Sequence, residues 1–165
     1  MATTDMIHPP LKRHVSLQPL SRDHYVGLVQ AQHLIRAGDA DVEARRQAVA
    51  EFIEAYRGEV GEHFDDEEDL LAPCISDLTM LERLFREHRT LRAMAVRLRD
   101  MASNPDGAFM KRVGQALHDH VRWEERELFP TLEATCPAEK LESLLAQTEK
   151  IEKRRRRGRG ACNAD

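Results

Sequence analysis

Apolar residues recur at intervals of three and four over four stretches of this chain, which is the pattern of helices that each bury one face. The stretches cover residues 17–37, 49–71, 77–102 and 109–128. Helix-breaking or turn-forming residues separate them at Gly38-Asp39, Pro73 and Asn104-Pro105-Asp106-Gly107. The pattern therefore predicts four helices joined by short connections. Pro130 is expected to bend the fourth helix or to end it.

The predicted helices favour one architecture. Short connections make successive helices antiparallel neighbours, so we expect an all-α fold, an antiparallel up-down-up-down four-helix bundle. Aromatic residues make up only 5% of the chain, which argues against a β-sandwich or barrel. A weaker apolar pattern predicts a short fifth helix. The expected division is an N-terminal arm at 1–16, the bundle at 17–135, a C-terminal helix at 136–153 and a basic flexible tail at 154–165.

The predicted helices repeat two sequence words. Residues 63–73 in the second helix and 120–130 in the fourth both read H-x-x-x-E-E-x-x-L-x-P. The first and third helices share L-x-R-[DE]-H, which ends at His24 in one and at His88 in the other. The first two helices therefore look like a duplicate of the last two. Two helical hairpins of this plan, folded together, would bring one His-Glu pair and one further histidine from each half to a common centre.

The repeated words place ionisable side chains on the apolar faces of their helices. Residues four apart lie one above the other, so His63 with Glu67, and His120 with Glu124, can each present an imidazole and a carboxylate to one point. Such groups are costly to bury without a partner, which predicts a bound metal rather than histidines bonded only to neighbouring acids. Four imidazoles and two carboxylates without a thiolate suit iron or manganese better than zinc, and such bundles hold two metals bridged by carboxylates.

The spacing of these residues resembles that of the hemerythrin-like, or HHE cation-binding, domains over about residues 15–135. The resemblance implies a non-haem di-iron centre that binds O2 or reacts with related small molecules. It also implies the metal ligands, which are His24, His63, Glu67, His88, His120 and Glu124.

The sequence departs from the oxygen-carrying members of that family. Carriers supply two histidines four residues apart from the third helix, whereas here Arg92 follows His88 at that spacing. They also use an aspartate five residues after the fourth-helix histidine; this chain has Glu125 there, and the internal repeat selects Glu124 at four. The pattern looks closer to the iron-sensing and iron-sulfur-repair branches, which also use His-x-x-x-Glu twice.

We therefore expect two non-haem iron ions, oxo- or hydroxo-bridged, in a protein that binds or senses O2, NO or iron. One alternative is a di-iron enzyme that acts on peroxide or NO, or that donates iron to damaged iron-sulfur clusters. Another is an iron storage or sensing module. The expected partner is O2, another small diatomic or peroxide. The sequence leaves open the physiological ligand, the redox partner, the oligomeric state and whether a turnover reaction takes place.

Several other polar residues need an interpretation. Tyr25 follows His24 directly, about 100° around the helix, so it is expected to pack at a helix interface; the alternative is a phenolate that reaches an iron. Glu127 is a candidate partner of a ligand histidine. The residues expected on the solvated surface are His8, His14, His33, Asp65, Asp66, Glu68, His118 and Glu125.

Composition and charge exclude several function classes. The net charge is −4, and because the C-terminal residues are strongly basic, the rest of the chain is more acidic than the whole. Nucleic-acid binding is therefore not expected. No apolar run approaches the roughly 20 residues that span a bilayer, and the first residues do not form a secretory signal, so we expect a cytoplasmic protein. The three cysteines are expected to be ordinary thiols.

Overall fold

The computed structural model describes residues 12–161, with side chains for residues 12–156. This part of the chain is helical and contains no strand, which confirms the predicted all-α fold. The elements are α1 (Gln18–Ala37), α2 (Val42–Ala55), the π-helical turn η1 (Tyr56–Val60), α3 (Gly61–Leu70), the 3-10 turn η2 (Ala72–Cys74), α4 (Leu78–Asp100), α5 (Gly107–Trp123), the π-helical turn η3 (Glu124–Leu128), α6 (Phe129–Thr135) and α7 (Ala138–Ala161). None of these helices is both long and apolar enough to cross a membrane.

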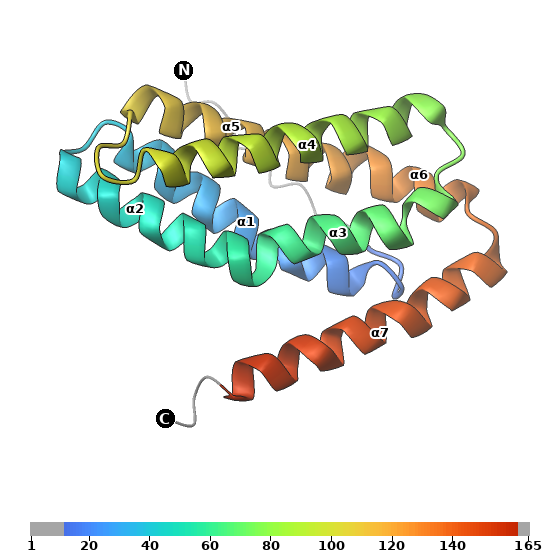
Figure 1. The fold of residues 1–165 in the computed structure, drawn as a ribbon. Coiled ribbons are helices and arrows are strands. Elements are labelled where there is room, and N and C mark those ends of the chain that lie inside the picture. The colour runs from blue at the N-terminus through green and yellow to red at the C-terminus, as the bar shows by residue number, and fades with distance from the viewer. Residues whose placement is uncertain (1–11, 162–165) are drawn as a thin grey trace, which may run out of the picture.

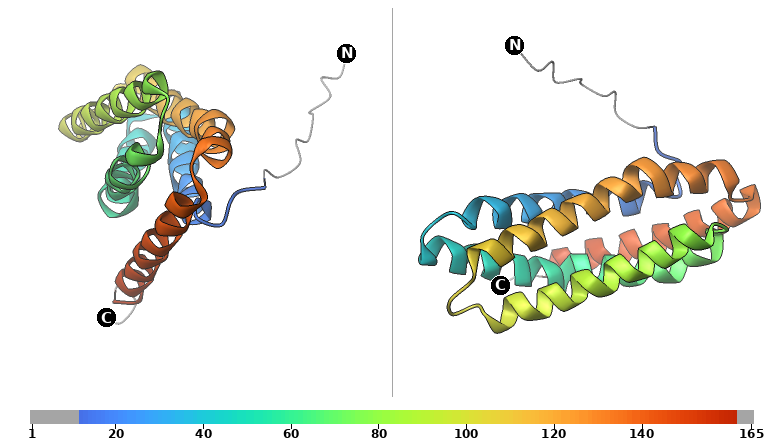
Figure 2. Two further views of the ribbon diagram at one scale, coloured as in Figure 1. Left: turned by 90° about the vertical axis from the view of Figure 1, so that its right-hand side faces the viewer. Right: turned by 90° about the horizontal axis from the view of Figure 1, so that it is seen from above.

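The four predicted helices form a bundle (Figure 1). They correspond to α1, the continuous run α2-η1-α3, α4, and the continuous run α5-η3-α6. Each runs in the direction opposite to its predecessor, as the short connections require. The end view in Figure 2 shows these four segments grouped together, with α7 projecting outside them.

Aspartate side chains fix where three of the helices begin. Asp41, Asp77 and Asp106 precede α2, α4 and α5, and each carboxylate accepts hydrogen bonds from backbone N–H groups of the first helical turn. These bonds satisfy donors that have no partner within the helix. Asp106 lies in the Asn-Pro-Asp-Gly run, and it caps α5 by accepting from Phe109 N at 3.0 Å. The chain turns slightly earlier than predicted, at residues 101–104, where Asn104 N donates to Met101 O at 3.0 Å, and Gly107 is already the first residue of α5.

The two copies of the long repeated word end differently. α3 ends at Leu70, shortly before Pro73, but the fourth bundle helix continues through Pro130 as α6, so Pro130 does not close it. The cause is the position of the π-helical turn. η3 ends at Leu128 with a wider turn, in which Phe129 N donates to Glu124 O, and Pro130 therefore stands in the first turn of α6, where a residue without an N–H is tolerated. In the first copy the π-helical turn η1 precedes the word instead.

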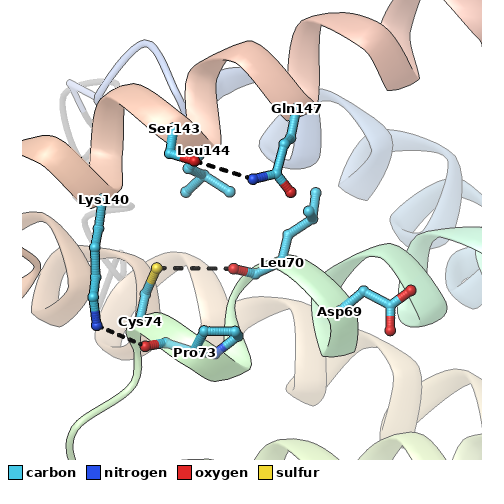
Figure 3. A pocket seen from close by; sticks show the side chains of 8 residues that line it. All are labelled: Asp69, Leu70, Pro73, Cys74, Lys140, Ser143, Leu144 and Gln147. Carbon is cyan, nitrogen blue, oxygen red and sulfur yellow. Dashed lines mark hydrogen bonds between the residues drawn. The ribbon is translucent and has the colours of Figure 1, made fainter.

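The fifth helix is longer than predicted. α7 continues past residue 153 to Ala161, so the segment expected to be a flexible tail is helical over residues 154–161. α7 is attached to the bundle near its start, where Lys140 Nζ donates to Pro73 O at 3.2 Å (Figure 3). It is attached again in its middle, where Thr148 Oγ1 donates to Ser16 O at 3.1 Å. Ion pairs from its basic residues hold the C-terminal half of α7 against the bundle. The spacing of apolar residues gives no sign of such ion pairs, so the prediction ended the helix too early.

Two apolar clusters fill the bundle, and a polar layer lies between them. The first cluster includes Ala31, Leu34, Phe52, Leu91, Met110 and Leu117. The second includes Leu20, Leu71, Leu84, Trp123, Leu128 and Phe129. In α1, for example, His24 lies between Leu20 of the second cluster and Ala31 of the first. The buried histidines and glutamates therefore occupy a central layer that apolar side chains close off on both sides.

Candidate metal centre

The six residues predicted as ligands converge in the central layer. The π-helical turn η3 begins at the last of them, and such turns are frequent at functional sites. All six are buried, with at most 4% of their surface exposed. They are His24 from α1, His63 and Glu67 from α3, His88 from α4, His120 from α5 and Glu124 from η3.

The first group of potential ligand atoms combines the two histidines of the first half of the chain with both glutamates. His24, His63, Glu67 and Glu124 each offer an atom, and these atoms all lie within 4.8 Å of one another. His63 Nε2 lies 3.0 Å from Glu67 Oε1, and His24 Nε2 lies 3.0 Å from Glu124 Oε2. The two imidazoles and one oxygen of each carboxylate therefore surround a single point.

A second group uses the same glutamates with the histidines of the other half. Glu67, His88, His120 and Glu124 again offer atoms within 4.8 Å of one another. His120 Nε2 lies 3.1 Å from Glu124 Oε1, and His88 Nε2 lies 3.3 Å from Glu67 Oε2. Each half of the internal repeat thus supplies both histidines of one group, while each glutamate contributes to both groups. Both glutamates therefore lie between two groups of residues that could each hold a metal ion.

Several inner atoms lie close to one another without well-formed hydrogen bonds, although His24 Nε2 is 3.4 Å from Glu67 Oε1 and within hydrogen-bond distance of it. His63 Nε2, Glu67 Oε2 and both oxygens of Glu124 are buried and have no hydrogen-bond partner of acceptable geometry. Nε2 of His88 and Nε2 of His120 lie 3.1 Å apart, although only one of two such nitrogens can donate to the other. Buried polar atoms are rarely left unpaired in proteins. Atoms directed at shared points rather than at each other fit bound cations, so the chemistry of this set matches a metal site.

Each of the four histidines also turns its Nδ1 toward a carboxylate on a different helix. The pairs are His24 with Glu125 at 2.6 Å, His63 with Asp23 at 3.2 Å, His88 with Glu68 at 2.9 Å and His120 with Glu87 at 2.8 Å. We call Asp23, Glu68, Glu87 and Glu125 the outer carboxylates. A carboxylate accepts the Nδ1 proton, which leaves the Nε2 lone pair free to face the centre. The ring orientation and the tautomer are therefore both set for metal binding.

Arginines neutralise the outer carboxylates in turn. The pairs are Arg13 with Glu125 at 2.7 Å, Arg92 with Glu68 at 2.7 Å, Arg83 with Glu87 at 2.6 Å, and Arg155 with Asp23. The centre is thus built in layers, with two inner carboxylates, four imidazoles, four outer carboxylates and four guanidinium groups. Hydrogen bonds and charges of the arginines and of the ligand histidines outweigh burial and lower the pKa of Glu68, of Glu87 and of Glu125. Within the described residues, the arginines of the outermost layer form no ion pair with the two inner carboxylates, whose charge is balanced by the histidines.

Protons on the histidines perform that balancing when no cation is bound. Burial alone would lower the pKa of His120, but the charge and hydrogen bond of Glu124 raise it to about 10. The pKa of His24 and that of His88 are also raised, because hydrogen bonds to carboxylates outweigh burial. Burial would raise the pKa of Glu124, yet the neighbouring imidazoles, His120 foremost, hold it well below its ordinary value. A cation that binds here therefore displaces protons.

The structure corrects several interpretations of single residues. Tyr25 is 72% exposed, so it neither packs at a helix interface nor reaches the centre. Glu127 is exposed and is not among the outer carboxylates. Glu68 and Glu125, expected on the solvated surface, are instead bonded to ligand histidines.

The repeated words contained a signal for the outer carboxylates. Asp23 and Glu87 occupy the [DE] position of the short word, and Glu68 and Glu125 are the second glutamate of the long word. Asp23 and Glu87 each bond a histidine of their own half, whereas Glu68 and Glu125 bond one of the other half. The same sequence positions therefore perform the same task twice.

Arg92 occupies the position at which oxygen carriers have a second third-helix histidine. Its guanidinium binds Glu68 and also Asp65, in both cases at 2.7 Å, and the side chain is 32% exposed. It lies in the outermost layer of the centre and supplies no ligand atom. Each group of inner residues therefore contains two histidines, so the two halves of the chain supply equal numbers of histidine nitrogens to the centre.

Two of the three cysteines, Cys74 and Cys136, lie within the described residues and belong to neither group of inner residues, whereas Cys162 lies outside the described residues. Cys74 lines a pocket between the end of α3 and the start of α7 together with Leu70, Lys140 and Leu144 (Figure 3). Burial and the neighbouring Cys136 thiol raise the pKa of Cys74 to about 11. Cys74 is therefore a thiol rather than a reactive thiolate at neutral pH, as expected for an ordinary thiol.

Comparison with known families gives one match. The sequence fits the hemerythrin HHE cation-binding domain over residues 20–132 and a second time over residues 79–160. The first match contains all six inner residues, and the second begins in α4, where the second copy of the repeat begins. Comparisons with curated proteins and with solved structures gave no match.

Proposed function

This chain belongs to the hemerythrin HHE cation-binding domain family, and from that we propose that it is a non-haem di-iron protein that binds or senses O2, NO or iron. The observation that carries the proposal is the set of unpaired inner atoms. Buried imidazole nitrogens and carboxylate oxygens converge on two points, while every Nδ1 is already engaged by an outer carboxylate.

The residues divide between the two irons by halves of the chain. His24 and His63 would hold one ion and His88 and His120 the other, with Glu67 and Glu124 shared between them. Nitrogen and carboxylate donors without a thiolate suit iron in preference to softer metals. Iron would supply redox chemistry and open coordination positions, and the outer carboxylates would hold the imidazoles in place throughout.

The surroundings of the centre favour a very small ligand. Two nitrogens and two carboxylate oxygens for each ion leave about two of six octahedral positions for other ligands. The inner residues are buried, and the apolar clusters close the layer on both sides. A diatomic molecule or peroxide suits such a space better than an organic substrate.

Arg92 favours sensing or a reaction with a small molecule over oxygen carriage. A carrier-like centre has unequal ions, because the third helix gives one of them an additional histidine. Here the donors of the two halves are equal, and Arg92 neutralises Glu68 instead. The same arrangement would serve chemistry on peroxide or NO, so turnover assays belong to the test.

The first test is the metal content of the purified protein. We expect about two irons per chain after expression with sufficient iron, measured by elemental analysis. His120→Ala should lower this content, whereas His118→Ala should not. His118 lies on the same helix, is 36% exposed, pairs with Asp119 and belongs to neither group of inner residues, so it is a matched control. Zinc alone, or a single metal per chain in repeated preparations, would contradict the proposal.

The second test separates binding from turnover. The reduced iron-loaded protein should show a visible absorption change when O2 or NO is added under controlled anaerobic conditions. Return of the original spectrum on removal of the gas indicates binding or sensing. Evolution of O2 from peroxide, or consumption of NO over many equivalents, would favour the enzymatic alternative. No response to O2, NO or peroxide would leave iron itself as the sensed or stored species.

A further inference from the structure

One of the four arginines in the outermost layer comes from α7, outside the four-helix bundle. Arg155 binds Asp23 of α1 through Nη1, and it binds Asp66 of α3 through Nη2 at 2.6 Å. Its side chain is only 10% exposed, although it lies in a run of otherwise exposed basic residues. Asp23 is the outer carboxylate of His63. A single guanidinium therefore connects α7 with the two helices that supply His24 and His63.

The C-terminal half of α7 depends on these charge contacts. Ile151 is the last buried apolar residue of the helix within the described side chains. Beyond it, Lys153, Arg154 and Arg156 are exposed, whereas Arg155 is largely buried against the bundle. Two more exposed ion pairs accompany it, between Glu152 and Arg22 of α1 at 2.8 Å and between Arg154 and Asp66 at 3.5 Å. Charge contacts with α1 and α3 therefore hold this part of α7, and Asp23 and Asp66 accept the most buried of them.

We infer that Arg155 is a positioning residue of the metal centre, through which docking of the C-terminal half of α7 and metal binding stabilise each other. Arg155 fixes Asp23 so that it accepts the Nδ1 proton of His63, and this directs His63 Nε2 toward the centre. Because coupling between two sites is reciprocal, a metal that orders His63 and Asp23 also favours the docked position of α7. The inference rests on the proposed metal function.

The test uses two variants and a matched control in the full-length protein. Arg155→Gln removes the connection, and Asp66→Asn weakens the pairs of Arg154 and Arg155 with α3 while the hydrogen bond between Asp23 and His63 keeps both of its partners. The control is Arg156→Gln, which makes the same change of charge one residue away. Arg156 is 70% exposed and pairs with Glu152 of its own helix.

Two measurements report on the two sides of the coupling. The first is the rate of iron(II) loss to an excess of a coloured chelator. We expect loss to be about tenfold faster in Arg155→Gln than in the wild type, and faster to a lesser extent in Asp66→Asn. The second is the rate of trypsin cleavage after Lys150 and Lys153, which remain in every variant. Cleavage should be slower with iron than without it in the wild type, and this difference should shrink in both variants.

The outcomes distinguish the inference from the function on which it rests. Iron loss and cleavage in Arg155→Gln that equal those of Arg156→Gln would overturn the inference while the metal function stands. Faster cleavage with unchanged iron loss would also overturn it, because α7 would then dock without positioning His63. A wild-type chain that takes up no iron would refute the proposed function itself, and the inference with it. If Arg155→Gln does not fold, Asp66→Asn alone decides between these outcomes.

Discussion

At the scale of single residues, each imidazole of the centre is held between two carboxylates. His24, for example, faces Glu124 with Nε2 at 3.0 Å and Glu125 with Nδ1 at 2.6 Å. The outer carboxylate accepts a proton and fixes the ring, and the inner one shares the point toward which Nε2 is directed. Adjacent glutamates in the sequence thus have different roles, since one faces the centre and the other the back of a histidine.

A substitution that removes the charge of one outer carboxylate tests whether the inner and outer glutamates have these different roles. Glu125→Gln should weaken metal binding by about 10- to 100-fold, because the amide no longer fixes the Nδ1 proton of His24. Competition with a chelator of known affinity measures the change. Glu127→Gln is the control, since Glu127 is exposed and carries no bond to a ligand histidine. Equal affinities of the two variants would show that Glu125 does not act through His24.

The raised pKa of His120 predicts how the metal-free protein responds to pH. The folded pKa of about 10 lies above the ordinary value of 6.5, so protonation of His120 stabilises the fold below about pH 6.5. This contribution is lost as the pH rises toward 10. The melting temperature of the metal-free protein should therefore fall between pH 7 and pH 10. The decline should be smaller in His120→Gln and in the iron-loaded protein, where a bound cation replaces the proton.

At the scale of elements, the approach of α1 to α5 depends on a glycine. A Cβ at Gly114 of α5 would lie 2.6 Å from Ala31 O and 2.7 Å from Ile35 Cγ1, both in α1. These two helices carry His24 and His120, so their separation sets the width of the centre. By contrast, a Cβ at Gly58 in η1 would meet nothing within 4 Å.

Alanine at these two glycines should have opposite effects on stability. Gly114→Ala should lower the free energy of unfolding by about 1–3 kcal/mol, because backbone atoms of α1 would have to move. Gly58→Ala should raise it by about 0.4–1 kcal/mol, since it restricts the unfolded chain without a clash in the folded one. Denaturant midpoints of the metal-free variants measure both changes. A stabilising effect of Gly114→Ala would show that α1 and α5 adjust freely.

At the scale of the whole molecule, the polar layer opposes folding unless something balances its charge. Two glutamates and four histidines are buried between the apolar clusters. Metal ions bind these groups only when the bundle is assembled, so bound metal stabilises the folded state. The bundle is therefore expected to depend on metal occupancy for part of its stability.

Metal removal measures that dependence directly. Complete chelation should lower the melting temperature by about 5–10 °C, for a metal present at roughly 100 times its dissociation constant. His63→Ala should reduce the melting temperature more when iron is supplied than after chelation, because the variant loses the metal-dependent part of the stability. Differential scanning calorimetry of both proteins in both states checks this. Equal losses in the two states would indicate that His63 has only a structural role.

Local sequence patterns were sufficient to predict the bundle helices and to single out the six histidines and glutamates that lie together in the central layer. Helical periodicity is a local property, so apolar spacing located the four bundle helices, and aspartates at their starts capped three of them. Residues at positions i and i+4 lie one above the other on a helix. The sequence spacing alone therefore predicts that His63 lies beside Glu67 and that His120 lies beside Glu124, as the structure shows.

Only the tertiary structure decided which groups meet across helices. The pairing of Asp23 with His63 and of Glu125 with His24 depends on the register in which separate helices pack, and helical periodicity does not specify that register. The same holds for the path of the chain through Pro130, which depends on the π-helical turn before it, and for α7, whose C-terminal half is held by Arg155. Contacts between distant segments arise only when the chain has folded.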